Sequence, residues 1–148
     1  GFDHELTGRE NIFLNGMLLG RTRREIRERL DAIVEYSELG DFIESPIRAY
    51  SSGMLGRLGF AIASAWTPHL LILGEVFAAG DASFTRKCEK TLQDFRDAGV
   101  TILLVSHSAA IVLETCTRAL WLERGRLVGN GSPEEIVAAY DKSTYATR

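Results

Sequence analysis

The stretch Tyr50-Ser51-Ser52-Gly53-Met54 opens an apolar, helix-patterned segment, and the residues that follow it decide the fold. The apolar run Leu70-Leu71-Ile72-Leu73 comes next and ends at Gly74-Glu75; Ala79-Gly80-Asp81 and Val105-Ser106-His107 follow in that order. A loop that turns into a helix exposes unpaired N–H groups and the positive end of the helix dipole, which suits a phosphate. A plain serine N-cap is the commoner explanation when the five residues are taken alone.

The bulk composition indicates an ordinary globular domain. The chain has 148 residues, of which 45% are hydrophobic and 25% charged, as in average soluble proteins. A net charge of −3 disfavours a general nucleic-acid binder, and the arginines between positions 21 and 29 alternate with acidic residues, as on a solvated helix face. Cys88 and Cys116 are expected to be reduced, buried thiols, and no Cys or His pair has the spacing of a metal site.

Helix signals dominate the first part of the chain. Capping boxes begin at Thr7, Thr22 and Ser132, each with a glutamate three residues later. Apolar residues at helical spacing follow each box. The sequence predicts helices over 7–20, 23–38, 52–66, 83–98, 108–116 and 133–141, with Gly20, Gly40 and Gly99 at C-terminal ends.

Short apolar runs with β-branched residues lie between the later helices. They are Leu70–Leu73, Thr101–Val105, Ala119–Leu122 and Arg126–Val128, with a hairpin turn between the last two. Their continuous apolar character predicts strands buried on both faces, and their alternation with helices predicts a parallel α/β sheet. We therefore expect a helical part over residues 1–66 and an α/β part over residues 67–148.

The order of these motifs resembles the second half of an ABC-type ATPase, with signature loop, Walker B strand, D-loop and switch histidine. Glu5–Ile12, Tyr36–Ile43, Tyr50–Met54, Trp121–Gly125 and Gly131–Glu135 are similar to one branch of that family, the ATP-binding subunits of bacterial exporters for O-antigen, capsule or teichoic acid. The resemblance covers nearly the whole chain. It implies the C-terminal part of a P-loop NTPase domain, with a helical subdomain followed by a partial, mostly parallel sheet with helices.

The same resemblance implies a set of site residues. Ser51, Ser52, Gly53 and Asp81 would contact nucleotide, while Glu75 would orient or deprotonate an attacking water and His107 would contact the γ-phosphate. Each position also has a structural alternative: a glutamate facing solvent, a hydrogen-bonded histidine at a strand end, and a glycine turn in which Asp81 caps a helix. For Asp81 the two roles are compatible.

Two departures limit what the resemblance implies. The chain contains no G-x-x-x-x-G-K-[ST] phosphate loop, and Gly74 stands where the family has the aspartate that holds magnesium. Catalytic degeneration and a deliberate change of this position both remain open. The intact family domain uses ATP and Mg²⁺, but this chain alone is expected to bind no metal, to bind ATP weakly and not to hydrolyse it. The chain begins with Gly1 rather than Met, and we expect it to be a fragment.

The partners implied are a second ABC ATPase domain in a homodimer and a membrane permease. No run is long enough to span a membrane and none has a signal-peptide pattern, so a cytoplasmic location is expected by default. The resemblance implies a position peripheral to the inner membrane. In the family's sheet the phosphate-loop strand lies between Thr101–Val105 and Ala119–Leu122. Without it, we expect these strands to pair directly or to be buried in an oligomer.

The sequence leaves two other functions open. The helical part could act as a non-catalytic interaction module that docks onto the permease. An unrelated α/β regulatory domain is a weaker alternative, because chance hardly supplies Ser51–Gly53, Glu75, Asp81 and His107 in this order.

Overall fold

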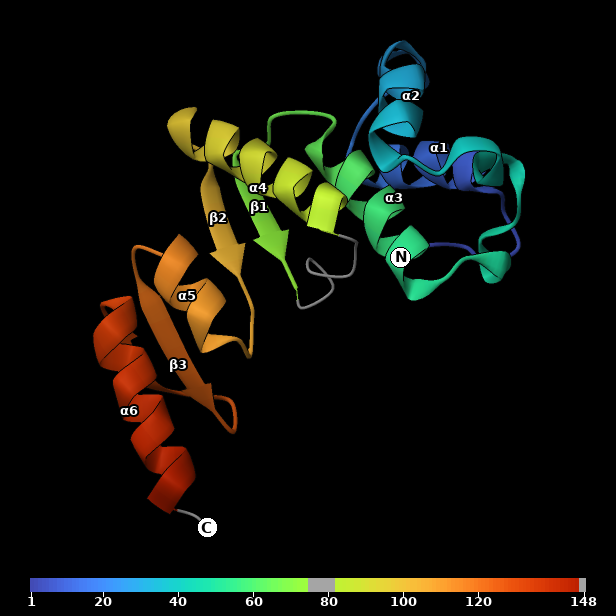
Figure 1. The fold of residues 1–148 in the computed structure, drawn as a ribbon. Coiled ribbons are helices and arrows are strands. Elements are labelled where there is room, and N and C mark those ends of the chain that lie inside the picture. Colours follow the sequence, from blue (N-terminus) through green and yellow to red (C-terminus); the bar gives the residue numbers. More distant parts are fainter. Residues whose placement is uncertain (75–81, 147–148) are drawn as a thin grey trace. The chain divides into compact units, whose positions relative to one another are not determined.

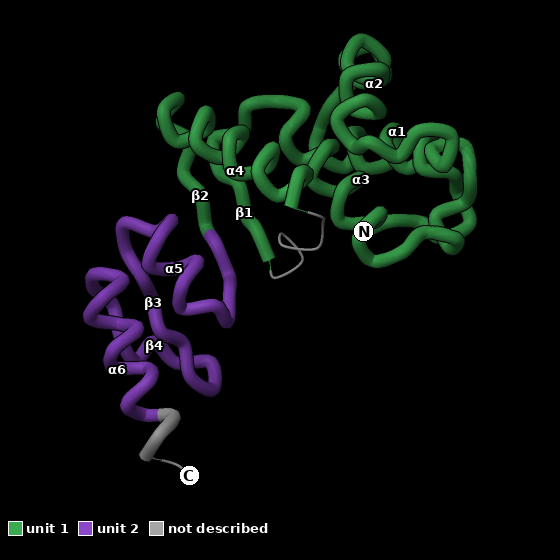
Figure 2. The backbone as a smooth tube through the Cα atoms, viewed as in Figure 1, with its two compact units in different colours: residues 1–103 green, residues 104–148 purple. Residues whose placement is uncertain are grey.

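The computed structural model of the protein describes residues 1–74 and 82–146 (Figure 1). The chain divides into two compact units, residues 1–103 and residues 104–148 (Figure 2). The predicted division into residues 1–66 and 67–148 stays a prediction, since it rests on the kind of element and not on compactness. The elements of the first unit, with β2 at its boundary, are α1 (Gly8–Leu18), α2 (Arg23–Ser37), the 3-10 helices η1 (Gly40–Glu44) and η2 (Ile47–Ala49), α3 (Ser52–Ser64), β1 (Leu70–Leu73), α4 (Ala82–Asp97) and β2 (Thr101–Leu104). The second unit contains α5 (Ala109–Thr115), β3 (Ala119–Glu123), β4 (Arg126–Gly131) and α6 (Pro133–Ala146).

The predicted capping boxes fix where three helices begin. The Thr7 hydroxyl accepts from the Glu10 N–H at 3.1 Å, and the Thr7 N–H donates to the Glu10 carboxylate at 2.8 Å. Thr22 and Glu25 make the same reciprocal pair at the start of α2, and Ser132 and Glu135 make it at α6. The hydrogen bonds from the two threonines lower the pKa of the Glu10 and Glu25 carboxyls.

The C-terminal end of α2 differs from the prediction. Gly20 and Gly99 have positive φ after α1 and α4, as predicted. After α2 it is Glu38, with φ 54° and ψ 30°, that adopts the left-handed conformation, and Gly40 already belongs to η1. The left-handed conformation costs free energy for a glutamate, because its Cβ restricts φ and ψ in a way that does not apply to glycine.

The core of the first unit is the interior of the helical part. The apolar stripe of α2 points inward, with Ile26 and Ile33 buried and Leu30 and Val34 packed against them. Side chains of α1, α3 and the two 3-10 helices complete one cluster: Ile12, Leu39, Ile43, Ile47, Tyr50, Leu58, Ala61 and Ile62. Burial of this apolar surface is the main stabilising contribution to the helical part.

The strands β1 and β2 form a two-stranded sheet and run in the same direction (Figure 1). The prediction that these strands are buried on both faces is wrong. Leu71 and Leu73 are 5% and 7% exposed, whereas Leu70 and Ile72 are 51% and 63% exposed. Apolar residues on both sides of a strand indicate two faces that can be covered, but within residues 1–74 and 82–146 only one face of β1 is.

The second unit is a hairpin with two helices. β3 and β4 pair antiparallel from Ala119 opposite Gly131 to Glu123 opposite Arg126. The predicted turn is confirmed, because Arg124 and Gly125 both have positive φ, as a type I′ turn requires. Trp121 of β3 meets Tyr140 of α6 edge to face at 5.7 Å between ring centroids. α6 therefore packs against the hairpin.

One further prediction is corrected by the structure. Within the first unit β2 pairs with β1, and within the second β3 pairs with β4; that Thr101–Val105 and Ala119–Leu122 pair directly or are buried in an oligomer stays a prediction. Cys88 is fully buried as predicted, but Cys116 is partly exposed because it lies at the C-terminal end of α5. In the part of the chain that the structure describes, no helix has the length and apolar character needed to cross a membrane.

Candidate functional site

The N-terminal turn of α3 holds three of the predicted site residues together. Ser51 is the N-cap residue, with φ −70° and ψ 164°, and its hydroxyl accepts from the Met54 N–H at 3.2 Å. The Ser51 carbonyl accepts the first helical hydrogen bond, from the Leu55 N–H at 3.0 Å. Ser51 and Ser52 are exposed, and Gly53 is half-buried. The turn therefore presents its polar groups at the surface.

The loop before this turn is anchored by Tyr50. Its side chain is buried, and its hydroxyl donates to the Phe42 carbonyl at 2.6 Å. The Tyr50 N–H donates to the Ile47 carbonyl at 2.9 Å. Burial raises the pKa of the Tyr50 phenol. The position of Ser51 is thus set by a buried neighbour before any ligand arrives.

The capped turn retains hydrogen-bonding capacity for an anion. Capping uses a lone pair of the Ser51 hydroxyl, so its O–H remains able to donate. The N–H groups of Ser52 and Gly53 belong to the first turn, where no intrahelical acceptor exists, and the helix dipole adds positive potential. The N-cap role and a phosphate contact are therefore compatible at Ser51.

The end of β1 does not fit a magnesium ion. Gly74 is exposed, and a Cβ placed there would meet open space, so the position offers room but no ligand oxygen. Within the described ranges, 1–74 and 82–146, no group of three or more His, Cys, Asp or Glu side chains could hold a metal. Glu75, Gly80 and Asp81 lie outside the described residues.

His107 belongs to the second compact unit. It is exposed in the turn between β2 and α5. The neighbouring Ser106 hydroxyl accepts from the Ser108 N–H at 3.0 Å, and the Ser108 hydroxyl caps α5 by accepting from the Ile111 N–H at 3.4 Å. The structure brings Ser51, Ser52 and Gly53 together in one turn, and it holds the His107 turn in place through serine side chains.

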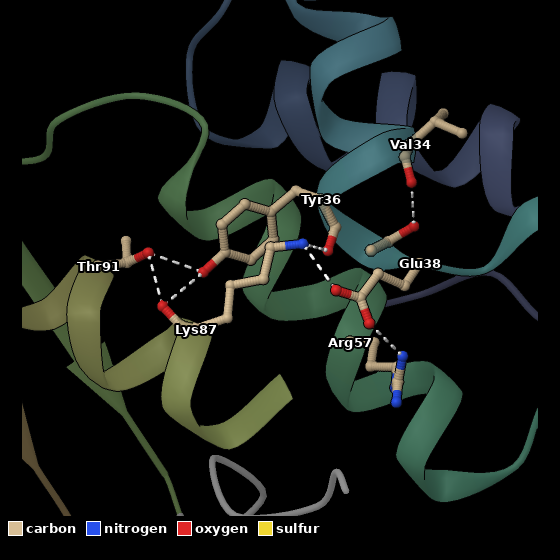
Figure 3. A network of polar contacts seen from close by, with 7 residues as sticks. Val34, Tyr36, Glu38, Arg57, Lys87 and Thr91 are labelled. Atoms are coloured by element: carbon tan, nitrogen blue, oxygen red, sulfur yellow. Dashed lines mark hydrogen bonds and ion pairs between the residues drawn. The ribbon is translucent and has the colours of Figure 1, made fainter. Parts of the chain in front are cut away.

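A polar cluster that the sequence did not reveal joins α3 to α2 and α4. Glu38, at the end of α2, is ion-paired both with Arg57 of α3 and with Lys87 of α4 (Figure 3). These contacts join residues 19 and 49 positions apart, so local periodicity could not predict them. One signal was present: Arg57 is a charged residue in the otherwise uncharged segment 52–64, and such a residue needs a partner when buried.

Comparison with known proteins finds relatives in sequence. No family model matches the chain. The O-antigen export system ATP-binding protein RfbB of Klebsiella pneumoniae is 52% identical over 143 residues, covering 97% of this chain and 58% of RfbB. The teichoic acids export ATP-binding protein TagH of Lactococcus lactis is 44% identical over 142 residues, covering 96% of this chain and 30% of TagH. The chain therefore spans about half the length, or less, of these curated relatives.

A solved structure agrees on the fold. The ATP-binding subunit of an ABC transporter superposes with a TM-score of 0.78 over 95% of this chain and 59% of the other, at 24% sequence identity. This likeness shows the fold alone, which is that of an ABC transporter ATP-binding subunit. In sequence, the chain is a relative, at 44–52% identity, of ATP-binding subunits of O-antigen and teichoic acid export systems, and it spans only part of their length.

Proposed function

We propose that this chain supplies the signature surface of an ATP-binding subunit that powers export of a cell-surface polysaccharide. The capped, exposed turn at Ser51–Gly53 carries the proposal, because it offers a hydroxyl and the N–H groups of a first helical turn to a phosphate. The likeness to named O-antigen and teichoic acid export proteins supports the substrate class. The protein would act in the cytoplasm, at the membrane surface, on a permease.

The turn suits a phosphate that is already held elsewhere. No G-x-x-x-x-G-K-[ST] sequence supplies a cradle of N–H groups and a lysine within this chain, and Gly74 supplies no carboxylate for Mg²⁺. We therefore assign the cradle to the phosphate loop of a second ATPase domain, in a homodimer of complete subunits. ATP bound there would place its γ-phosphate against Ser51, Ser52 and Gly53.

Glu75 and His107 are proposed as the catalytic groups. In the sequence Glu75 comes two residues after the last residue of β1, and α/β proteins bind ligands beyond the carboxyl ends of their parallel strands. A carboxylate there would orient or deprotonate the attacking water, and the exposed His107 imidazole would hydrogen-bond to the γ-phosphate. Asp81, the proposed D-loop residue, would contact the nucleotide of the second domain.

Hydrolysis measured with two chains tests this proposal. A phosphate-loop-bearing exporter subunit, disabled by alanine at its own signature serine, is mixed with this chain. We expect the chain alone to show no Mg²⁺-dependent turnover and the mixture to regain it. Ser51→Ala should lower the regained rate about tenfold or more, the scale of losing one donor to a developing charge.

Ser64→Ala is the matched control on the same helix. The Ser64 hydroxyl donates to the Phe60 carbonyl inside α3, away from the first turn, so this variant should leave the regained rate unchanged. ATP turnover by the purified chain would refute the predicted inactivity. A Ser51→Ala chain that still restores the full rate would refute the phosphate contact.

A permease-docking role has its own observation. Met17, Leu18 and Leu19, at the end of α1, are 41%, 66% and 56% exposed and form an apolar patch on the helical part. Binding of the chain to permease cytoplasmic loops should fall in Leu18→Glu and persist in Ser51→Ala and Glu75→Gln. The reverse pattern would contradict a docking role for this patch.

A further inference from the structure

The carboxylate of Glu38 connects three helices. Its Oε2 accepts from Arg57 Nη1 at 3.0 Å, which ties the end of α2 to α3. Its Oε1 accepts from Lys87 Nζ at 2.9 Å, which ties the same residue to α4 (Figure 3). The Arg57 side chain is 17% exposed and the Glu38 side chain 40%, so the pair is shielded from water on the Arg57 side only.

The backbone of Glu38 points to a specific use of its side chain. Glu38 ends α2 in the left-handed conformation, which is unfavourable for a residue with a Cβ and ordinary for glycine. Such conformations persist where the surrounding contacts over-determine them. The two cations are those contacts, since they fix the carboxylate that this backbone conformation presents to α3 and α4.

Tyr36 supplies a second connection to α4. Lys87 Nζ donates to the Tyr36 carbonyl at 2.9 Å and lies 4.4 Å from the centre of the Tyr36 ring. The Tyr36 hydroxyl is hydrogen-bonded to Thr91 Oγ1 at 2.7 Å, and its ring meets Phe84 edge to face. Residues 84, 87 and 91 are three and four positions apart, so one face of α4 is held against α2.

We infer that Glu38 is a positioning residue for the proposed phosphate-binding turn. Arg57 lies about one and a half helical turns after the start of α3, and Lys87 lies in the first turns of α4. By holding both, Glu38 fixes the entry of α4 at Ala82 relative to Ser51–Gly53. Asp81, the proposed D-loop residue, immediately precedes Ala82 in the chain. The positioning role of Glu38 therefore rests on the proposed function.

Glu38, Arg57 and Lys87 together are called the Glu38 clamp. Distance measurement between spin labels tests this clamp without any nucleotide. Labels are attached to cysteines at Glu35 on α2 and Lys90 on α4, both exposed, in a chain whose partly exposed Cys116 is changed to serine. The unchanged clamp should give a narrow distance distribution. Glu38→Gln, which removes the charge, and Glu38→Gly, which also relieves the backbone, should both broaden it.

Glu28→Gln is the matched control. Glu28 pairs with Arg24 at 2.9 Å within α2, so the loss of this pair should keep the narrow distribution. If both Glu38 variants also keep it, the clamp is refuted. If the Glu38 variants do not fold, Lys87→Met and Lys87→Arg decide. A distance distribution that broadens in Lys87→Met but not in Lys87→Arg supports the clamp, and one that stays narrow in Lys87→Met refutes it.

The two-chain hydrolysis assay tests the positioning role. At a temperature where both chains are folded, Glu38→Gln should lower the maximal regained rate about tenfold, with the ATP concentration for half-maximal rate unchanged. A stabilising role alone would lower the thermal midpoint and leave this rate intact, which would refute positioning. If the unchanged chain restores no hydrolysis, the proposed function fails, while the label distances still decide the clamp.

Discussion

At Gly16 the backbone of α1 lies close to a side chain of α2. A Cβ at position 16 would lie 2.7 Å from both Cδ1 and Cγ1 of Ile26, a distance that real Cβ atoms do not tolerate. Ile26 is fully buried and has little room to move. The absent side chain at Gly16 is therefore a packing requirement and not a need for unusual backbone angles.

Replacing Gly16 by alanine should destabilise the protein despite alanine's higher helix propensity. Overpacking against Ile26 is expected to lower the free energy of unfolding by about 1–3 kcal/mol. Gly59→Ala in α3 is the matched control, since its Cβ would meet Phe2 at an ordinary 3.6 Å. That variant should gain about 0.5–1 kcal/mol. Urea unfolding measures both, and equal effects would contradict the packing argument.

Two buried acidic groups predict a loss of stability at alkaline pH. Burial raises the pKa of the Cys88 thiol from 9.0 to about 11 and that of the Tyr36 phenol from 10.0 to about 12. Because the folded state holds these protons more tightly, the stabilisation is complete below the unfolded pKa values. It is lost as pH rises through the folded ones.

The thiol can be isolated by mutation. Between pH 9 and pH 11 the free energy of unfolding should fall by up to about 2–3 kcal/mol from Cys88 alone. Cys88→Ala should flatten the fall in this range, although the variant is less stable at pH 7 because of the small cavity. Urea titrations at several pH values measure the slope, and an unchanged slope in Cys88→Ala would show that other groups cause it.

At the scale of helices and strands, local chemistry predicted most boundaries. Capping boxes at Thr7, Thr22 and Ser132 fixed three helix starts, and Gly125 marked the hairpin turn. The faces of the strands could not be predicted in the same way. A run of apolar residues indicates that both faces of a strand can be covered. It does not indicate which element packs on each face.

A substitution by threonine should change the free energy of unfolding strongly on the buried face of β1 and weakly on its exposed face. Leu71→Thr places a hydroxyl in a buried site and removes packing, and is expected to cost about 2 kcal/mol or more. Ile72→Thr lies on the exposed face, where threonine also suits a strand, and should change stability by less than about 0.5 kcal/mol. Thermal unfolding compares the two, and a larger cost at Ile72 would mean that its face is covered in solution.

At the scale of the whole molecule, the sequence predicted the capped turn at Ser51 but not the polar cluster of Glu38, Arg57 and Lys87. Ser51 was predictable because its cap is local. Glu38, Arg57 and Lys87 meet through the fold, with 19 and 49 positions between the partners. Only the sole charge of α3 hinted at a partner, and nothing in the spacing named Glu38.

The two compact units differ in how much core they contain. The helices α1, α2 and α3 share a buried cluster that includes Ile12, Ile33 and Leu58. In the described part of residues 104–148, the buried residues are Ala119 and Pro133, and α5 has no buried residue. A unit with so little buried apolar surface has little free energy to oppose local opening.

Hydrogen exchange should therefore separate the two units. Amides of α5 and α6 are expected to exchange at least about thirtyfold faster than those of α1 and α2, which corresponds to about 2 kcal/mol in opening free energy. α4 is the internal control, because it belongs to the first unit and buries Phe84, Cys88 and Phe95, so its amides should be slower than those of α5. Mass spectrometry of peptides from each helix gives the rates. If α5 and α6 are as protected as α2, residues 104–148 are covered in solution by a surface beyond their own core, as a second copy of the chain would provide.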